Sequence, residues 1–346
     1  MKIVRVLGWS LIAACSLCAG ESDSPASNSE KLPGWIFLDD VTVGARALVG
    51  KDSSGTLTDQ QMQHFFAVSG GVRAGEWLSI HALAATGGDF AGGWNNSGPG
   101  LASGSGAVFL KQLYVAVHPL KGAEFQVGGF GVERGVGSDI ASYSQDGFMT
   151  GARMIIRPSK RVFFDRVSAT FGYLGDRDKP GIEHRLRRLS RVNYRQFMVV
   201  KNFGDAAAVS MDYTDRAGAK TFRQSVQFKT PSLGVIDSFR VDLYERANYT
   251  SAMGGVVSAG KIIASRWHVE AGYAAIDRNY GDWNADAFFH GRRLYAATSF
   301  SITSTLSAFL LINKSVGNSY LVPNGMHFHA GFSYDVLKAL RGASIL

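Results

Sequence analysis

The chain has 346 residues, of which 46% are apolar and only 18% are charged. Glycine is abundant at 41 residues, aromatic residues make up 12% of the chain, and proline occurs 8 times. The charged share is low for a soluble protein, yet no apolar stretch after residue 20 is long enough for a transmembrane helix. These features exclude a helical membrane protein and are typical of a β-barrel.

The first twenty residues have the pattern of a cleaved export signal. A positive start is followed by a short apolar core at 6–14 and a small-residue cleavage region at 16–20. The segment around Cys15 also resembles a lipobox, so a lipid on Cys15 is an open alternative. Cys15 and Cys18 are the only cysteines. Cleavage after residue 20 would leave no thiol for a disulfide or a metal site.

The charge balance is moderately basic. The formal net charge of +8 would fall to +6 with the loss of Lys2 and Arg5 in the signal. This excess is spread along the chain, which indicates a bias in a pore or on a surface and no nucleic-acid partner. The sequence has no P-loop, HExxH or GxSxG motif, so we expect no cofactor and no enzyme.

After a Ser-, Asn- and Pro-rich segment at 21–34, which we expect to be a flexible periplasmic lead-in, the chain reads as one domain from 35 to 337 with a tail at 338–346. Short runs of alternating apolar and polar residues predict its strands. In chain order the expected strands are 41–49, 63–74, 78–84, 107–117, 124–132, 148–157, 166–174, 194–203, 206–214, 221–229, 239–244, 255–264, 267–276, 290–303, 306–315 and 326–337.

The last expected strand shows the alternation most clearly. Its stripe assigns Phe328, Phe332 and Tyr334 to lipid, and His327, His329 and Asp335 to water. We expect this strand to close the sheet by pairing with 41–49. A helical turn at 336–340 is the one helix expected outside the loops.

Short turns alternate with long loops along the whole chain. Since every backbone amide must be paired in hydrocarbon, a closed barrel is the one β solution for a membrane. The sequence therefore predicts an all-β, antiparallel transmembrane β-barrel of about sixteen strands, with fourteen and eighteen left open. Short turns would face the periplasm and long loops the outside.

This architecture resembles that of Gram-negative outer-membrane porins. The last strand is similar to the carboxy-terminal assembly signal of that class at His329, Gly331, Tyr334 and Val336. It departs from the signal because Val336 is not aromatic and a tail follows. The resemblance implies an outer-membrane location, passive diffusion of small hydrophilic solutes, contact with the barrel assembly machinery, and a homotrimer as the usual assembly.

The inward face of such a barrel would be basic. If the apolar alternates face lipid, the pore-lining candidates are Arg46, Arg73, Arg153, Arg157, Arg223, Lys229, Arg240 and Arg293. Asp212, Asp242, Glu270 and Asp335 share this face. The excess of cations predicts weak anion selectivity. The alternative is that these side chains fill and solvate the wall by pairing with one another.

Two loops carry further candidates. In the porins that this chain resembles, the third outside loop folds inward, which would place Glu133, Asp139 and Asp146 of loop 133–147 opposite the basic wall. An ordinary surface loop is the alternative, and the longer second loop, 87–106, could be the plug instead. The fourth loop is basic and suggests lipopolysaccharide contacts, for which the candidates are Arg185, Arg187, Arg188 and Arg191. A solvated or partly helical loop is the alternative there.

Histidines and aromatic residues give weaker signals. His327 and His329 share a face and could bind a metal, but no third ligand is evident. The residues expected to form interfacial aromatic girdles are Trp35, Trp77, Tyr114, Phe163, Phe164, Trp267, Tyr273 and Tyr334.

The leading prediction is therefore a passive outer-membrane channel. A barrel enzyme acting on lipid is the first alternative, and it needs a Ser/His/acid set at the lipid-facing rim, which the sequence does not reveal. A structural or adhesive barrel is the second alternative, and it would show no conductance.

Overall fold

The computed structural model describes residues 34–89, 92–100, 103–138, 140, 147–158, 162–229, 234–247, 253–277, 291–317 and 325–343. The predicted export signal, with Cys15 and Cys18, lies outside the described residues.

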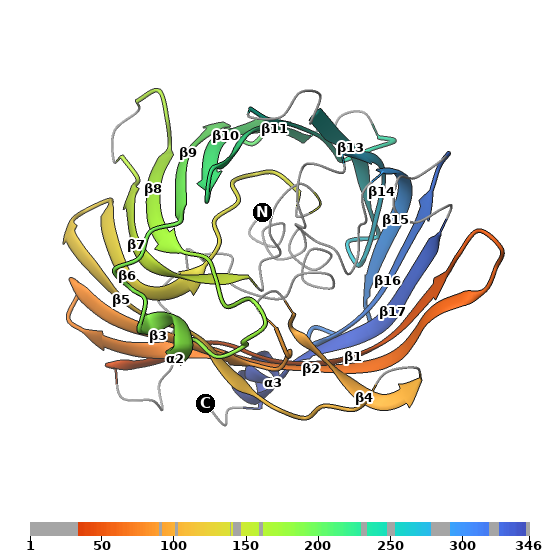
Figure 1. The fold of residues 1–346 in the computed structure, drawn as a ribbon, viewed down its shortest axis with the longest axis horizontal. Helices are drawn as coiled ribbons and strands as arrows, with labels where there is room; N and C mark the ends of the chain where they lie inside the picture. The colour runs from red at the N-terminus through yellow and green to blue at the C-terminus, as the bar shows by residue number, and fades with distance from the viewer. Residues whose placement is uncertain are drawn as a thin grey trace.

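Within these residues the strands form one 17-stranded antiparallel sheet (Figure 1). They are β1 (Ile36–Lys51), β2 (Leu57–Ala74), β3 (Leu78–Ala85), β4 (Trp94–Gly100), β5 (Phe109–Leu120), β6 (Ala123–Gly131), β7 (Phe148–Ile156), β8 (Arg166–Tyr173), β9 (Tyr194–Phe203), β10 (Ala207–Arg216), β11 (Ala219–Lys229), β12 (Ser238–Arg246), β13 (Met253–Ile263), β14 (Trp267–Ile276), β15 (Gly291–Ser301), β16 (Leu306–Ser315) and β17 (Met326–Asp335).

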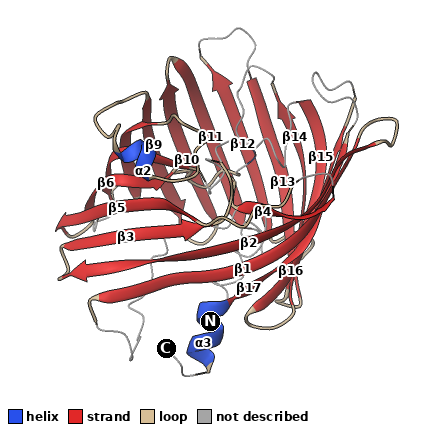
Figure 2. Cartoon of the chain, turned by 60° about the horizontal axis from the view of Figure 1, so that its bottom comes forward, coloured by secondary structure: helices blue, strands red, loops and turns tan. Residues whose placement is uncertain are grey.

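The sheet closes on itself through its first and last strands. β1 pairs with β17 from Thr42 opposite Asp335 to Lys51 opposite Met326, and it pairs with β2 along its other edge. β3 pairs with one half of β2 and β4 with the other half, so these two strands share one place in the ring. The barrel therefore has sixteen strands around its circumference, which confirms the predicted all-β antiparallel barrel (Figures 1 and 2).

The strand boundaries differ from the prediction at three places. β4 was expected to be loop, because its sequence WNNSGPG has no apolar alternation. β1 and β2 extend further than expected, which leaves only 52–56 between them. The expected loop 215–220 is mostly strand, since β10 and β11 meet at Ala217 and Gly218, which both have positive φ (+50° and +90°), as a tight hairpin turn requires.

The two faces of the sheet have opposite chemistry. On β17 the inward His329 is fully buried while the outward Phe332 is 51% exposed. On β12 the neighbours Asp242 and Leu243 are 2% and 56% exposed. Apolar side chains thus point out and polar ones point in, the inverse of a soluble protein and the pattern of a barrel surrounded by lipid.

Exposed aromatic residues gather where the short turns are, at what we call the turn end of the barrel. Trp35 precedes β1, and Trp77 and Phe163 lie in turns, with exposed fractions of 56%, 59% and 87%. This is the position that an interfacial girdle requires. Tyr114 does not belong to it, because its ring faces inward and stacks on His81.

Two short helices accompany the barrel, α2 (Glu183–Leu186) in the fourth loop and α3 (Val336–Gly342) directly after β17. Asp335 caps α3 by accepting a hydrogen bond from the Lys338 backbone N–H at 2.8 Å. Leu337 is 3% exposed, and Arg341 donates to the Leu38 carbonyl at 3.0 Å. The predicted turn at 336–340 is thus a helix that packs against the start of β1 at the seam of the barrel.

No helix among the described residues is long and apolar enough to cross a membrane.

We expect Leu337→Ala to lower the free energy of unfolding by about 2–5 kcal/mol, because it leaves a cavity where α3 meets β1. Urea unfolding of the detergent-solubilised barrel, followed by heat-modifiable mobility, measures the change. Lys338→Ala, at the exposed neighbouring position, is the control. Equal stability of the two variants would show that α3 does not support the seam.

Candidate pore constriction

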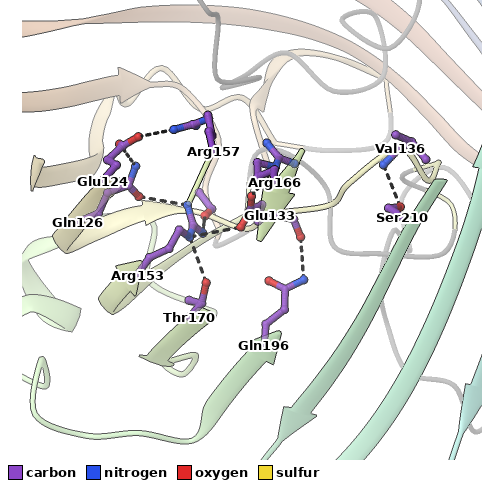
Figure 3. Close-up of polar contacts among 11 residues, drawn as sticks. Glu124, Gln126, Glu133, Val136, Arg153, Arg157, Arg166, Thr170, Gln196 and Ser210 are labelled. Carbon is purple, nitrogen blue, oxygen red and sulfur yellow. Dashed lines mark hydrogen bonds and ion pairs between the residues drawn. The ribbon is translucent and has the colours of Figure 1, made fainter. Parts of the chain in front are cut away.

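The third loop, which follows β6, begins at a charged anchor inside the barrel (Figure 3). Glu133 is 7% exposed, and its carboxylate lies 3.3 Å from Arg166 Nε and 3.8 Å from Arg153 Nε. Gln196 on β9 donates to the Glu133 carbonyl at 3.0 Å. Three neighbouring strands therefore hold the first turn of the loop against the inner wall.

Arg153 is positioned by the strands on both sides of it. Its Nε donates to Thr170 on β8 at 3.1 Å, and its Nη1 donates to Gln126 on β6 at 3.3 Å. The guanidinium also lies over the Phe130 ring, 4.3 Å from the centroid. Since the planar fork is held in this way, Arg153 is a fixed counter-charge for Glu133.

The loop then runs along the inner wall from β10 to β12. The Val136 N–H donates to Ser210 Oγ on β10 at 3.1 Å. Ser138 donates to Asp242 Oδ2 on β12 from its N–H at 2.9 Å and from its Oγ at 2.5 Å. Figure 1 shows this yellow segment inside the ring. The predicted inward fold of the third loop thus agrees with the described part of it.

Two glycines allow the loop to approach the wall closely. Gly135 has φ +66°, and a Cβ built on it would lie 2.5 Å from Ser210 Oγ. A Cβ on Gly137 would lie 2.5 Å from Ser225 Oγ. A side chain at either position would therefore have to displace the facing serine hydroxyl or move the loop away from the wall.

The wall facing this loop carries predicted lumen cations. Equal numbers of strands separate β10 from β1 in both directions around the ring, so the Ser210 contact lies across the lumen from Arg46. Asp139 and Asp146 lie outside the described residues. Glu133 was expected to oppose the basic wall, but its carboxylate is bound within that wall by Arg153 and Arg166, because the loop turns down immediately after β6.

All eight predicted pore-lining cations lie on the inward face, and at least three of them have carboxylate partners. Arg223 Nη2 lies 2.8 Å from Asp212, and both side chains are buried. Arg157 Nη1 lies 2.9 Å from Glu124 on β6, and Arg153 pairs with Glu133. For these three, mutual pairing, which was the alternative, describes the wall better than an unbalanced positive charge.

Arg46 and Arg293 have neutral partners. Arg46 Nε donates to Gln63 at 2.6 Å, and its guanidinium lies 4.5 Å from the centre of the Trp94 ring. Arg293 donates from Nε to Asn313 at 2.5 Å and from Nη1 to Ser315 at 3.2 Å. Hydrogen bonds to amides and hydroxyls therefore hold these guanidinium groups in place on the wall.

Arg73, Lys229 and Arg240 are the more accessible members of the set. Arg73 and Lys229 are exposed at the turn end, and Arg240 is half-buried. Arg73 is opposite the buried Ser79 in the β2–β3 register, so it shares the inward face. Because side chains alternate along a strand, Lys229 shares the face of Gln227, which is opposite Arg240 on β12.

Sequence reasoning missed the inward Arg166 and the buried Lys111. Arg166 is the first residue of β8, where alternation is too short to define a face. Lys111 is 2% exposed, and its Nζ donates to the Asp89 carbonyl at 3.1 Å and to the Gly92 carbonyl. A register shift between β3 and β5 falls at Lys111, so alternation does not define the face of this residue.

The described part of the second loop forms β4, which pairs with β2 and extends the wall of the barrel. These residues therefore lengthen the wall and do not plug the lumen. Trp94 nevertheless enters the lumen, where its ring contacts Phe65 and Phe309 at centroid distances of 5.4 and 6.2 Å. These contacts place the start of β4 beside Arg46 on the inner wall.

The fourth loop packs against the outward face of the barrel wall. Ile182 is fully buried, and its N–H donates to the Leu110 carbonyl at 2.8 Å. It belongs to an apolar cluster with Phe130 and Phe148. A Cβ on Gly129 would touch the Ile182 side chain, and Thr150 Oγ1 donates to the Arg185 carbonyl at 3.1 Å. Gly129 and Thr150 are opposite each other and alternate with the inward residues of β6 and β7, so α2 packs on the outward face of these strands.

The placement of α2 corrects the expectation for Arg185. Its side chain is fully buried, it donates to the carbonyls of Gly175 and Asp176 at 2.8 and 2.7 Å, and it lies over the Phe148 ring. It is therefore an internal brace of the loop and cannot reach lipopolysaccharide. Arg188 pairs with Asp176 at 3.2 Å, whereas Arg187 and Arg191 are exposed.

His327 and His329 both point inward and are 5% and 0% exposed. Within the described residues no group of three His, Cys, Asp or Glu side chains could hold a metal ion. Among those residues the pair gains no third ligand.

No protein-family model and no curated protein sequence matches the chain. Solved structures of the porin from Rhodopseudomonas blastica do match. A triple mutant of that porin aligns with 86% of this chain and 100% of its own, with a TM-score of 0.55 and 11% identity. A double mutant gives the same coverage with a TM-score of 0.56 and 10% identity. The chain thus has a porin-like fold, a closed antiparallel barrel of sixteen strands.

We expect a disulfide to form between cysteines introduced as Gly137→Cys and Ser225→Cys. A Cβ on Gly137 would lie 3.4 Å from the Ser225 Cβ, close to the range that disulfides require. Mass spectrometry of the oxidised protein measures the crosslink, and Gly55→Cys with Ser225→Cys is the control. A crosslink no more frequent than in the control would contradict the inward position of the loop.

Proposed function

We propose that this protein is a passive channel for small hydrophilic solutes in the outer membrane. The observation that carries the proposal is the closed ring with a polar inner face and an apolar outer face, narrowed by the third loop along β9 to β12. A barrel of this strand number encloses an aqueous lumen wide enough for solutes. Diffusion through it needs no cofactor and no energy source.

The proposed selectivity is weakly in favour of anions. Arg73 and Lys229 are exposed on the inward face. The ion pairs at Arg153, Arg157 and Arg223 reduce the positive excess, so we expect a small preference.

The proposal places the turn end in the periplasm and the loop end outside. Its partners are outer-membrane lipid, lipopolysaccharide at Arg187 and Arg191, and the barrel assembly machinery that recognises the last strand. The assembly is proposed to be a homotrimer on the porin resemblance. No nucleic-acid partner is proposed.

A lipid-cleaving enzyme is less well supported. Ser79 Oγ lies 2.9 Å from His81 Nε2, a contact that a hydrolase could use. Both residues face the lumen, and Glu124, the acid that lies near His81, is bound to Gln126 and Arg157. Membrane lipid has no access to this pair from the outer surface of the barrel.

The purified, heat-modifiable protein should produce discrete single-channel steps in planar bilayers bathed in KCl. Such steps follow from a water-filled lumen, and a structural or adhesive barrel would give none. Folded protein that inserts but never conducts would exclude the channel.

Replacing lumen cations should move the reversal potential in a KCl gradient towards cation preference. We expect this shift for Lys229→Gln combined with Arg240→Gln, because both positions lie on the inward face. Arg195→Gln, at an exposed position between the buried Tyr194 and Gln196, should leave the potential unchanged.

Arg223 is unsuitable for this test, since its removal would leave the buried Asp212 unpaired at a cost of about 3–5 kcal/mol. An equal shift in the control variant, or none in the double variant, would show that these cations do not set selectivity.

A further inference from the structure

Aromatic rings form a continuous row on the inner wall between β1 and β6. The ring centroids of Phe37 and His81 are 5.1 Å apart, and those of His81 and Tyr114 are 4.7 Å apart with an interplanar angle of 4°. Tyr114 in turn lies 6.2 Å from Phe130, edge to face. Arginines contact both ends of the row, Arg73 over Phe37 at 4.9 Å and Arg153 over Phe130 at 4.3 Å.

The register of the sheet explains why these rings meet. On β2 the residue between Phe37 and His81 is Gly71, which has no side chain to separate the two rings. His81 and Tyr114 are directly opposite each other on β3 and β5. The residue opposite Tyr114 on β6 is Gly128, so the next ring comes from Phe130, two residues further along.

The row climbs the wall from one end of the barrel to the other. Phe37 and Arg73 lie next to the ends of β1 and β2 at the turn end, whereas Phe130 is close to the loop end of β6. Figure 2 shows these strands side by side. The Phe130 end of the row meets the Arg153–Glu133 anchor of the third loop. A solute that passes the loop therefore encounters the row next.

The part of the row nearest the turn end is accessible, and its cation, Arg73, has no bonded partner for its guanidinium among the described residues. Phe37, His81 and Tyr114 are half-buried, whereas Phe130 is 1% exposed. Within the described part of the chain, the Arg73 guanidinium makes no hydrogen bond and no ion pair. Its exposed fork can therefore accept a planar anion beside the rings.

We propose that Arg73, Phe37, His81 and Tyr114 form a binding track for aromatic carboxylates on the inner wall. The carboxylate would bind the Arg73 guanidinium in a bidentate manner, while the aromatic ring packs against the half-buried rings. This inference rests on the proposed channel and names a class of solute that it would favour.

The charges around the track are compatible with an anion. Asp39 lies near Arg73 and is itself near Arg341, so that acid has a second cation. Glu124, on the His81 side, is bound to Arg157 at 2.9 Å. His118 also faces His81. Arg157 thus neutralises Glu124, and Asp39 interacts with both Arg73 and Arg341.

Equilibrium binding tests the track independently of conductance. The probes are benzoate, which carries ring and charge, cyclohexanecarboxylate, which has the charge without the aromatic ring, and benzyl alcohol, which has the ring without the charge. Saturation-transfer NMR on the folded barrel in detergent measures the dissociation constant of each. We expect benzoate to bind at least several-fold more tightly than either of the others, since only benzoate uses both halves of the track.

Two variants test the residues. Arg73→Gln should weaken benzoate binding about tenfold, as the loss of a charged bidentate contact predicts. Tyr114→Leu should weaken benzoate binding and leave that of cyclohexanecarboxylate unchanged. Phe125→Leu, which removes an aromatic ring from the lipid-facing side of β6, is the control and should bind like the parent protein. If Tyr114→Leu does not fold, Arg73→Gln at the exposed end carries the test.

Current recordings separate this inference from the proposed function. Benzoate should reduce the KCl current of the parent protein and reduce it less in Arg73→Gln. Normal KCl steps with no preference for benzoate over cyclohexanecarboxylate, or an equal loss of binding in Phe125→Leu, would overturn the track and leave the channel standing. Selective benzoate binding by folded protein without KCl steps would support the track and overturn the channel.

Discussion

The pairing of β1 with β17 is the constraint on which the rest of the structure depends. In hydrocarbon an unpaired backbone amide costs several kcal/mol, so a sheet can span a membrane only if it has no free edge. The seam runs from Thr42 opposite Asp335 to Lys51 opposite Met326, and α3 covers its turn end through Leu337 and Arg341. Because closure fixes the register, it also decides which side chains face the lumen.

The closed barrel encloses a lumen, which the third loop and inward side chains fill only in part. The third loop enters the lumen, where charge and hydrogen bonds hold it at Glu133 and Ser138, whereas the fourth loop packs Ile182 against the outward face of the wall. Several cations of the inner wall form ion pairs with neighbouring carboxylates. The few exposed cations and the half-buried rings of β1 to β5 are then the groups that a passing solute meets.

The alternation in β17 predicted its facing and its partner correctly, because a two-residue period is unambiguous over ten residues. Where the period breaks, prediction failed. A register shift between β3 and β5 interrupts the alternation at Lys111, and β4 is a strand despite a loop-like sequence, because the protruding half of β2 offers it a partner. Arg185 was assigned to the outer surface because its neighbours are basic, whereas a long-range contact of Ile182 buries it. No local pattern could reveal such contacts.

Current through the protein, recorded while a charged, membrane-impermeant thiol reagent is added, tests the central claim most directly. Gln227 and Lys229 lie on the inward face of β11, and Val226 and Phe228 on its outward face. Single cysteines introduced as Gln227→Cys or Lys229→Cys should lose current on reaction, and cysteines introduced as Val226→Cys or Phe228→Cys should not. Equal effects at the four positions, or no current to modify, would contradict an aqueous lumen lined by the inward residues of this barrel.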